Sequence, residues 1–162
     1  MKIGIRLALG FAAIAVVMLV IIIISFSNLA SLNEGTRLIV HDRYPKVVWG
    51  NKIVDAINDA ARAMRNNVIA TSDKYIEERK KNDERIKAGG EETGKLIDSL
   101  KLTITTDEGK ALLAKLEEAR KGYNDSRTPF FEMVERKEFA AAGEYLLEKV
   151  RGPQSDYISA IL

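Results

Sequence analysis

Cysteine is absent from this chain and histidine occurs once, as His41. The lack of cysteine excludes disulfides and zinc sites built on thiolates, and a single histidine excludes a multi-histidine metal site. The abundant carboxylates lie on charged helix faces, with no sign of a shared desolvated cleft. We therefore predict a domain held together by its core alone, with no metal site, no cofactor and no catalytic residue.

Proline is also scarce, with three in 162 residues, and an excess of one charge is missing from most of the chain. Of the 25 lysines and arginines, all but Lys2 and Arg6 follow residue 29, where 23 of them balance 23 aspartates and glutamates. Nucleic acid, or an anionic membrane surface recognised by bulk charge, requires a basic excess that this part lacks. We expect no nucleic-acid partner.

What the chain does have is an uncharged stretch from Leu7 to Ser27, with the sequence LALGFAAIAVVMLVIIIISFS. A helix of this length reaches roughly 31 Å, which matches the hydrocarbon core of a bilayer. It is longer than the apolar part of a signal peptide, typically about 7 to 15 residues, and no clear small-residue cleavage site follows. We interpret it as a retained transmembrane helix.

Lys2 and Arg6 precede this helix, and positive charge favours the cytoplasmic side. The prediction is a bacterial inner-membrane protein with a single span and a periplasmic sensor part. Its expected divisions are a cytoplasmic N-terminus (1–6), a transmembrane helix (7–29) and a periplasmic domain (30–162).

The periplasmic part shows apolar residues at helical spacing and little strand-like alternation, which predicts an all-α fold. Short connections between long helices favour an antiparallel up-down-up-down four-helix bundle, preceded by the transmembrane helix. Apolar periodicity continues to Leu162, so we expect a longer protein with a second crossing beyond it. The four segments run to about Ser72, from Asp73 to about Thr103, from the Thr105–Glu108 turn onward, and from about Glu138.

Three places within these segments conflict with regular helix. Gly89 and Gly90 cost a helix about 2 kcal/mol relative to alanine, so a local break is expected there. Pro129 predicts either a kink or an early end before Phe130. Pro153 predicts a kink in the last helix.

Polar residues on the first bundle helix form a stripe beside its apolar face. Asn58, Arg62 and Arg65 belong to it, and the two arginines share one face. One interpretation is a solvated stripe with local ion pairs. The other is an anion site, since guanidinium groups present planar forks that match a carboxylate and a homodimer would double them across its axis.

On the fourth helix, Arg151, Gln154 and Tyr157 lie near the Pro153 kink, where a freed carbonyl is also expected. These residues either complete a pocket or divide between water and the core. The predicted site is therefore a small-carboxylate pocket, made by Asn58, Arg62, Arg65, Arg151, Gln154 and Tyr157.

Five stretches, in this order and spacing, resemble the N-terminal sensor part of methyl-accepting chemotaxis proteins with a four-helix bundle of the aspartate-receptor type. They are MKIGIRLALGF, DRYPKVV, ARAMRNNV, EGKALLAKLEEAR and LLEKVRGPQSDY, and the resemblance covers nearly all 162 residues. It implies a homodimeric receptor whose bundle lies between two membrane crossings. It also implies a coupling protein and a histidine kinase downstream.

In the aspartate-receptor type, arginines at a similar distance from the first crossing contact the ligand's carboxylates, and Arg62 and Arg65 match that placement. The three-arginine arrangement of that type is missing, so its amino-acid specificity does not carry over. Two alternatives remain. The same bundle can precede a histidine kinase or a cyclic-dinucleotide enzyme, or it can be a ligand-free structural or interaction module.

Overall fold

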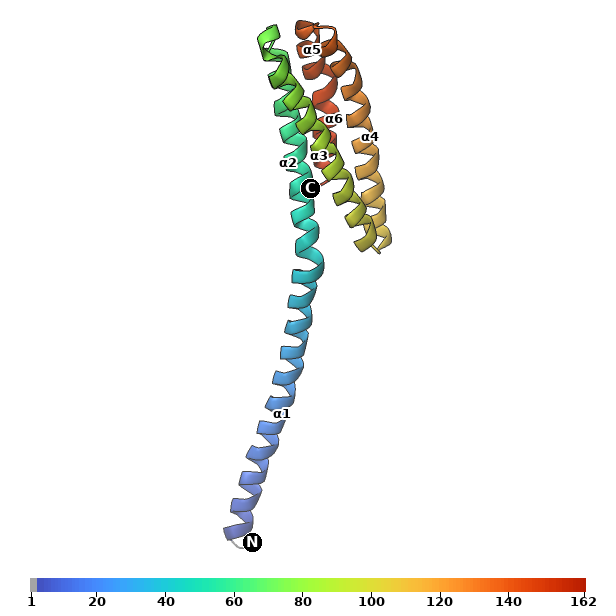
Figure 1. Ribbon diagram of the computed structural model, residues 1–162. Coiled ribbons are helices and arrows are strands. Elements are labelled where there is room, and N and C mark those ends of the chain that lie inside the picture. The colour runs from blue at the N-terminus through green and yellow to red at the C-terminus, as the bar shows by residue number, and fades with distance from the viewer. Residues whose placement is uncertain (1–2) are drawn as a thin grey trace. The chain divides into compact units, whose positions relative to one another are not determined.

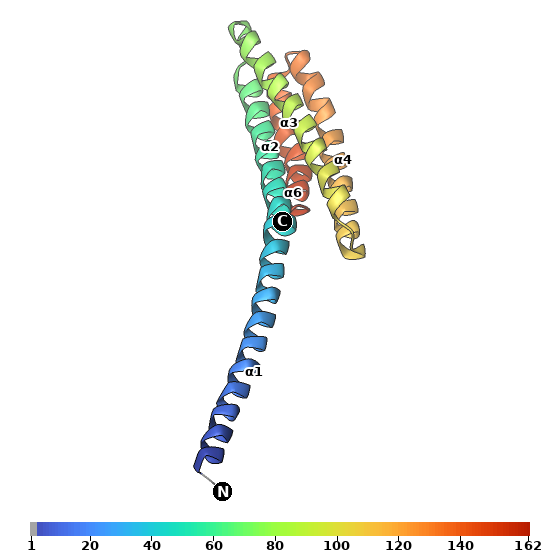
Figure 2. The ribbon, with the colours of Figure 1, turned by 60° about the horizontal axis from the view of Figure 1, so that its bottom comes forward.

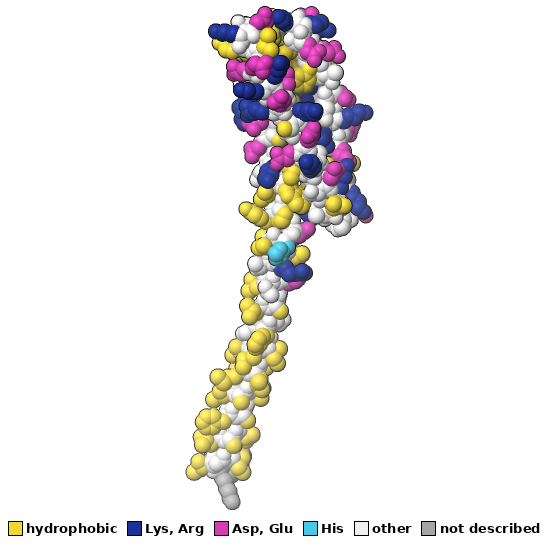
Figure 3. Space-filling view, viewed as in Figure 1, with side chains coloured by type: hydrophobic (Ala, Val, Ile, Leu, Met, Phe, Trp, Pro, Cys, Tyr) yellow, Lys and Arg dark blue, Asp and Glu magenta, His cyan; other side chains and the backbone are white. Residues whose placement is uncertain are grey.

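The computed structural model describes residues 3–162, apart from the side chain of Arg6, so Lys2 and the Arg6 side chain lie outside the described part. The chain divides into two compact units, residues 1–45 and 46–162, which we describe separately. In the first, helix α1 (Ile3–Leu38) carries exposed apolar side chains along its length (Figures 1 and 3). It is long and apolar enough to cross a membrane.

A π-helical segment, η1 (Ile39–Arg43), interrupts the α-helix near the end of the first unit. The Tyr44 N–H donates to the Ile39 carbonyl, five residues back. Pro45 follows at the second position of α2 (Tyr44–Ile69), where a missing N–H is tolerated. The interruption is therefore a change of helical type rather than a loop.

The second unit is an antiparallel four-helix bundle, as predicted, and all its regular elements are helical (Figures 1 and 2). The end of the fourth bundle helix lies beside the start of α2. A Cβ atom built on Gly50 would lie 3.3 Å from Ile161 Cγ2. Its helices are α2 from residue 46, α3 (Ile76–Thr103), α4 (Asp107–Glu135) and a fourth made of α5 (Phe139–Tyr145), η3 (Leu146–Val150) and α6 (Arg151–Ser159), with the short 3₁₀ helix η2 (Asp73–Tyr75) before α3.

The bundle core contains the apolar seam expected from the helical spacing. Each helix contributes side chains that are almost completely buried, and together they exclude water along the bundle axis. Figure 3 shows that the outer surface of this unit carries mixed lysine, arginine, aspartate and glutamate side chains. The largest fully buried core side chains include Ile53 and Met64 of α2, Ile97 of α3, Tyr123 and Phe130 of α4, and Val150 and Tyr157 of the fourth helix.

The predicted break at Gly89–Gly90 is wrong, because α3 continues through both glycines. An early end before Phe130 is also wrong, because α4 continues to Glu135 with Pro129 inside it. In both places buried neighbours hold the helix, namely Ile86 and Thr93 around the glycines and Phe130 beside the proline. Tertiary packing outweighs a local propensity cost of about 2 to 3 kcal/mol.

The irregularity expected near Pro153 takes the form of the π-helical segment η3, in which the Arg151 N–H donates to the Leu146 carbonyl. Proline has no N–H and its ring crowds the carbonyl four residues back. For Pro153 that carbonyl belongs to Lys149, inside η3. The wider π turn thus lies where the proline needs space, and it sets the rotation of α6.

Candidate functional site

A groove lies between α2 and the fourth helix, and we call it the arginine groove. Its volume is about 410 Å³. Helix α2 supplies one wall and the segment from η3 into α6 supplies the other. It is lined by Asn58, Ala61, Arg62 and Arg65 from α2, and by Leu146, Leu147, Arg151, Gln154, Ser155 and Ile158 from the fourth helix.

Helical spacing places the α2 arginines on one edge of the groove. Arg62 pairs with Asp59 one turn earlier, and both side chains are more than half exposed. Arg65 donates from Nε to the Ala61 carbonyl at 3.3 Å, which holds the start of its guanidinium against its own helix. The exposed ion pair between Arg62 and Asp59 contributes no more than about 1 kcal/mol to stability. Arg62 is therefore free to exchange Asp59 for another anion.

Arg151 is the first residue of α6 and faces these arginines from the other wall. Its position follows directly after η3, so the π segment determines how far its side chain is rotated toward α2. Among the described residues that line the groove, three are cationic and none is acidic. A groove with this charge and with apolar patches at Leu146 and Ile158 suits an organic anion.

Five of the six residues predicted for the site line this groove together: Asn58, Arg62, Arg65, Arg151 and Gln154. The structure does not bring Tyr157 to it. Tyr157 is 2% exposed and packs in the core against Tyr123, with ring centroids 5.9 Å apart. Position 157 is three residues after Gln154, yet the rotation of α6 directs this side chain inward.

The sequence analysis missed four lining residues on the fourth helix: Leu146, Leu147, Ser155 and Ile158. Three of them were available from helical spacing. Relative to Arg151, one helix face includes the residues four before, four after and seven after it. These are Leu147, Ser155 and Ile158. Leu146 lines the groove from the start of η3.

The described chain thus has a long apolar helix, a four-helix bundle and a cationic groove between the first and last helices of that bundle. The family model described as "four helix bundle sensory module for signal transduction" matches residues 1–161. The chain belongs to this family, which confirms the resemblance to chemoreceptor sensor parts. Neither the curated proteins nor the solved structures gave a match.

Proposed function

We propose that this chain is the sensor region of a transmembrane chemoreceptor that binds a small organic anion in the arginine groove. Residues 7–29 would cross the inner membrane, and residues 30–162 would form the periplasmic domain of a homodimer. The observation that carries the proposal is the meeting of Arg62, Arg65 and Arg151, which are distant in sequence, on the two walls of one groove. A sensory rather than catalytic role accords with the family.

The charge of the groove favours an anion with more than one negative charge. Arg62 has the exposed Asp59 as its ion-pair partner, and no carboxylate lines the groove itself, so a dicarboxylate that enters it would gain charge-assisted hydrogen bonds from two guanidinium groups. Asn58 and Gln154 add amide groups that hydrogen-bond to hydroxyl or carboxylate oxygens. We therefore propose a di- or tricarboxylate as the ligand class.

Such a ligand would transmit its signal by bridging α2 and α6. A ligand that contacts both walls binds better when α6 is in one position than when it is in another, and so favours that position. A ligand can drive a conformational change only through such a difference in binding. The π segment η3 and Pro153 make the adjoining turn of this helix the least regular part of the wall. A small displacement of α6 is the proposed output, passed toward a coupling protein and a histidine kinase.

The test uses the 162-residue chain in detergent micelles or nanodiscs, with succinate, malate, citrate and amino acids as probes. A ligand that binds only the folded state adds about 2.7 kcal/mol at a hundred times its Kd, so thermal melting detects it. For any hit, Arg62→Ala, Arg65→Ala and Arg151→Ala should each weaken binding by roughly 1.5 to 3 kcal/mol.

The matched control is Arg136→Ala, because Arg136 is also an exposed arginine in a local ion pair, with Glu138, and lies outside the groove. It should leave binding unchanged. Affinity that survives all three groove substitutions, or a neutral compound as the only hit, would show that the arginines are a solvated stripe.

A further inference from the structure

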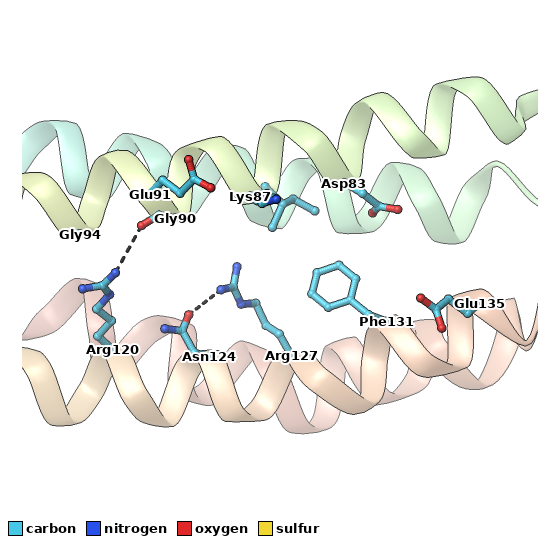
Figure 4. A pocket seen from close by; sticks show the side chains of 11 residues that line it. Asp83, Lys87, Gly90, Glu91, Gly94, Arg120, Asn124, Arg127, Phe131 and Glu135 are labelled. Atoms are coloured by element: carbon cyan, nitrogen blue, oxygen red, sulfur yellow. Dashed lines mark hydrogen bonds between the residues drawn. The ribbon is translucent and has the colours of Figure 1, made fainter.

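A second hollow lies between α3 and α4, on different helices from the arginine groove, and we call it the α3–α4 cleft. Its volume is about 610 Å³ (Figure 4). Unlike the arginine groove, it is lined by side chains of both charges. The lining residues are Asp83, Ile86, Lys87, Gly90, Glu91 and Gly94 from α3, and Arg120, Asn124, Arg127, Phe131 and Glu135 from α4.

Glycines on α3 create the space for two arginines of α4. A Cβ built on Gly90 would meet nothing within 4 Å, and one built on Gly94 would lie 3.1 Å from Arg120 Nη2. Arg120 uses that approach to donate from Nη2 to the Gly90 carbonyl at 3.3 Å. A larger side chain at position 94 would occupy the space of the Arg120 guanidinium, and one at position 90 would occupy the cleft itself.

The inner end of the cleft adjoins a small hole of about 20 Å³, and both share Ile86, Gly90, Arg120 and Arg127. Tyr123 and Tyr157 also line this hole, and each is 2% exposed. The space is large enough for one water molecule or one carboxylate oxygen.

Three buried polar atoms at this point have no hydrogen-bond partner within the described chain: Tyr123 Oη, Tyr157 Oη and Arg127 Nε. Buried polar groups are almost always paired, so three together require an explanation. Arg127 is held in place while its Nε remains unpaired, because its Nη2 donates to Asn124 Oδ1 and its Cζ lies 4.5 Å from the centre of the Tyr123 ring. The Arg127 guanidinium also acts on the Tyr123 hydroxyl and opposes the rise of its pKa, so Tyr157 Oη is the atom that most needs a partner from outside the chain.

The chemistry of the unpaired atoms identifies an acceptor. Burial raises the pKa of Tyr157 to about 12 and also raises the pKa of Tyr123, so both hydroxyls are protonated donors at neutral pH. The guanidinium Nε is a donor only. Donors from two tyrosines and an arginine, with Arg120 beside them, match a carboxylate.

We propose that the α3–α4 cleft is a second ligand site, which takes a small monocarboxylate with an apolar body, such as an aromatic acid. The carboxylate lies toward Arg120, Arg127 and the two tyrosine hydroxyls, while the apolar body contacts Ile86 and Phe131. Figure 4 shows Asp83 and Glu135 at the far end of the cleft, beyond the Phe131 ring. Their negative charge disfavours a ligand whose second carboxylate extends that way.

This site is independent of the arginine groove, and its test reads the buried tyrosines directly. The 162-residue chain is labelled with 3-fluorotyrosine in detergent micelles and titrated with sodium benzoate, with sodium chloride as the salt control. The ¹⁹F signals of Tyr123 and Tyr157, assigned by Tyr→Phe variants, should shift saturably. Those of the exposed Tyr44 and Tyr75 should not.

Gly90→Leu fills the cleft and should abolish the saturable shift. Its matched control is Gly122→Leu, since Gly122 is an exposed glycine of α4 with nothing within 4 Å of its Cβ position and should keep the shift. Arg120→Gln, which changes no backbone position, should weaken binding at least tenfold and serves if Gly90→Leu does not fold. Arg62→Ala and Arg151→Ala should leave the benzoate titration unchanged.

The absence of a saturable shift at both buried tyrosines would overturn the proposal and assign the hole to an ordered water. A shift that persists in Gly90→Leu and Arg120→Gln would also overturn it. Either result is distinguishable from failure of the arginine groove, which is measured with dicarboxylates and different variants.

Discussion

The arginine groove and the α3–α4 cleft both lie between helices of one bundle, yet they are built in different ways. The groove has three arginines that come from exposed helix faces. The cleft has two arginines with half-buried side chains, balancing carboxylates, and donors in the core without partners. The cationic lining of the groove needs only arginines on exposed helix faces. The cleft also needs glycines on α3, which leave room for α4 side chains to reach inward.

The largest test of this comparison is at Tyr157, which the sequence analysis offered either as a pocket residue or as a core residue and which the structure places in the core. Tyr157→Ala should cost about 3 to 5 kcal/mol of unfolding free energy, as for other large aromatic core truncations. Tyr157→Phe removes only an unpaired hydroxyl, so without ligand it should be neutral or slightly stabilising. Thermal and urea melts followed by circular dichroism measure both.

One result for the two Tyr157 variants would contradict the placement of this side chain in the core. If Tyr157→Ala melts like the parent chain, the side chain is not packed as described and the division between groove and core fails at this residue. Gln154→Ala is the control on the same helix, and because Gln154 lies in the groove it should change stability by about 0.5 kcal/mol or less.

Salt provides a second, smaller test of the difference between the two sites. Exposed charges are screened by added salt much more than buried ones. Raising NaCl from 50 to 500 mM should weaken dicarboxylate binding in the groove by about 3- to 10-fold, and benzoate binding in the cleft by less than about twofold. Titrations at both salt concentrations give the two ratios, and equal ratios would mean that the sites do not differ in exposure.

The smallest effect is expected at Asp83, at the acidic end of the cleft. Burial raises the pKa of this carboxyl above its ordinary value, although it accepts a 2.7 Å hydrogen bond from Asn67 Nδ2. The ionised form therefore lowers stability at neutral pH, and this cost disappears as the pH falls through the folded pKa. Asp83→Asn should be more stable than the parent chain at pH 7 by up to about 0.5 kcal/mol, and this advantage should shrink as the pH falls through the folded pKa and vanish below the ordinary value of 3.8.

Melting curves across this pH range, with Asp98→Asn as an exposed control on the same helix, test the sign. A stability gain for Asp83→Asn that grows toward low pH would mean that the carboxylate is stabilised rather than penalised in the folded state.

Several features of this protein were predictable because they depend on spacing along the chain. The uncharged run after residue 6 predicted a helix fit to span a membrane, and apolar periodicity predicted the bundle. Arg62 and Arg65 are neighbours on α2, and Arg151 and Gln154 are neighbours on α6, because each pair is separated by about one helical turn. Helical geometry alone fixes such neighbours.

Other features depended on contacts between helices that spacing does not encode. Gly89 and Gly90 locally favour a break, but buried neighbours keep α3 continuous and turn Gly90 into the wall of a cleft. Arg151 faces α2 across the groove, while Tyr157 on the same helix packs against Tyr123 in the core. The sequence determined the helices and which residues share a face, because periodicity is local. Only the tertiary structure decided which faces meet and which polar atoms remain unpaired, because burial depends on residues far apart in the chain.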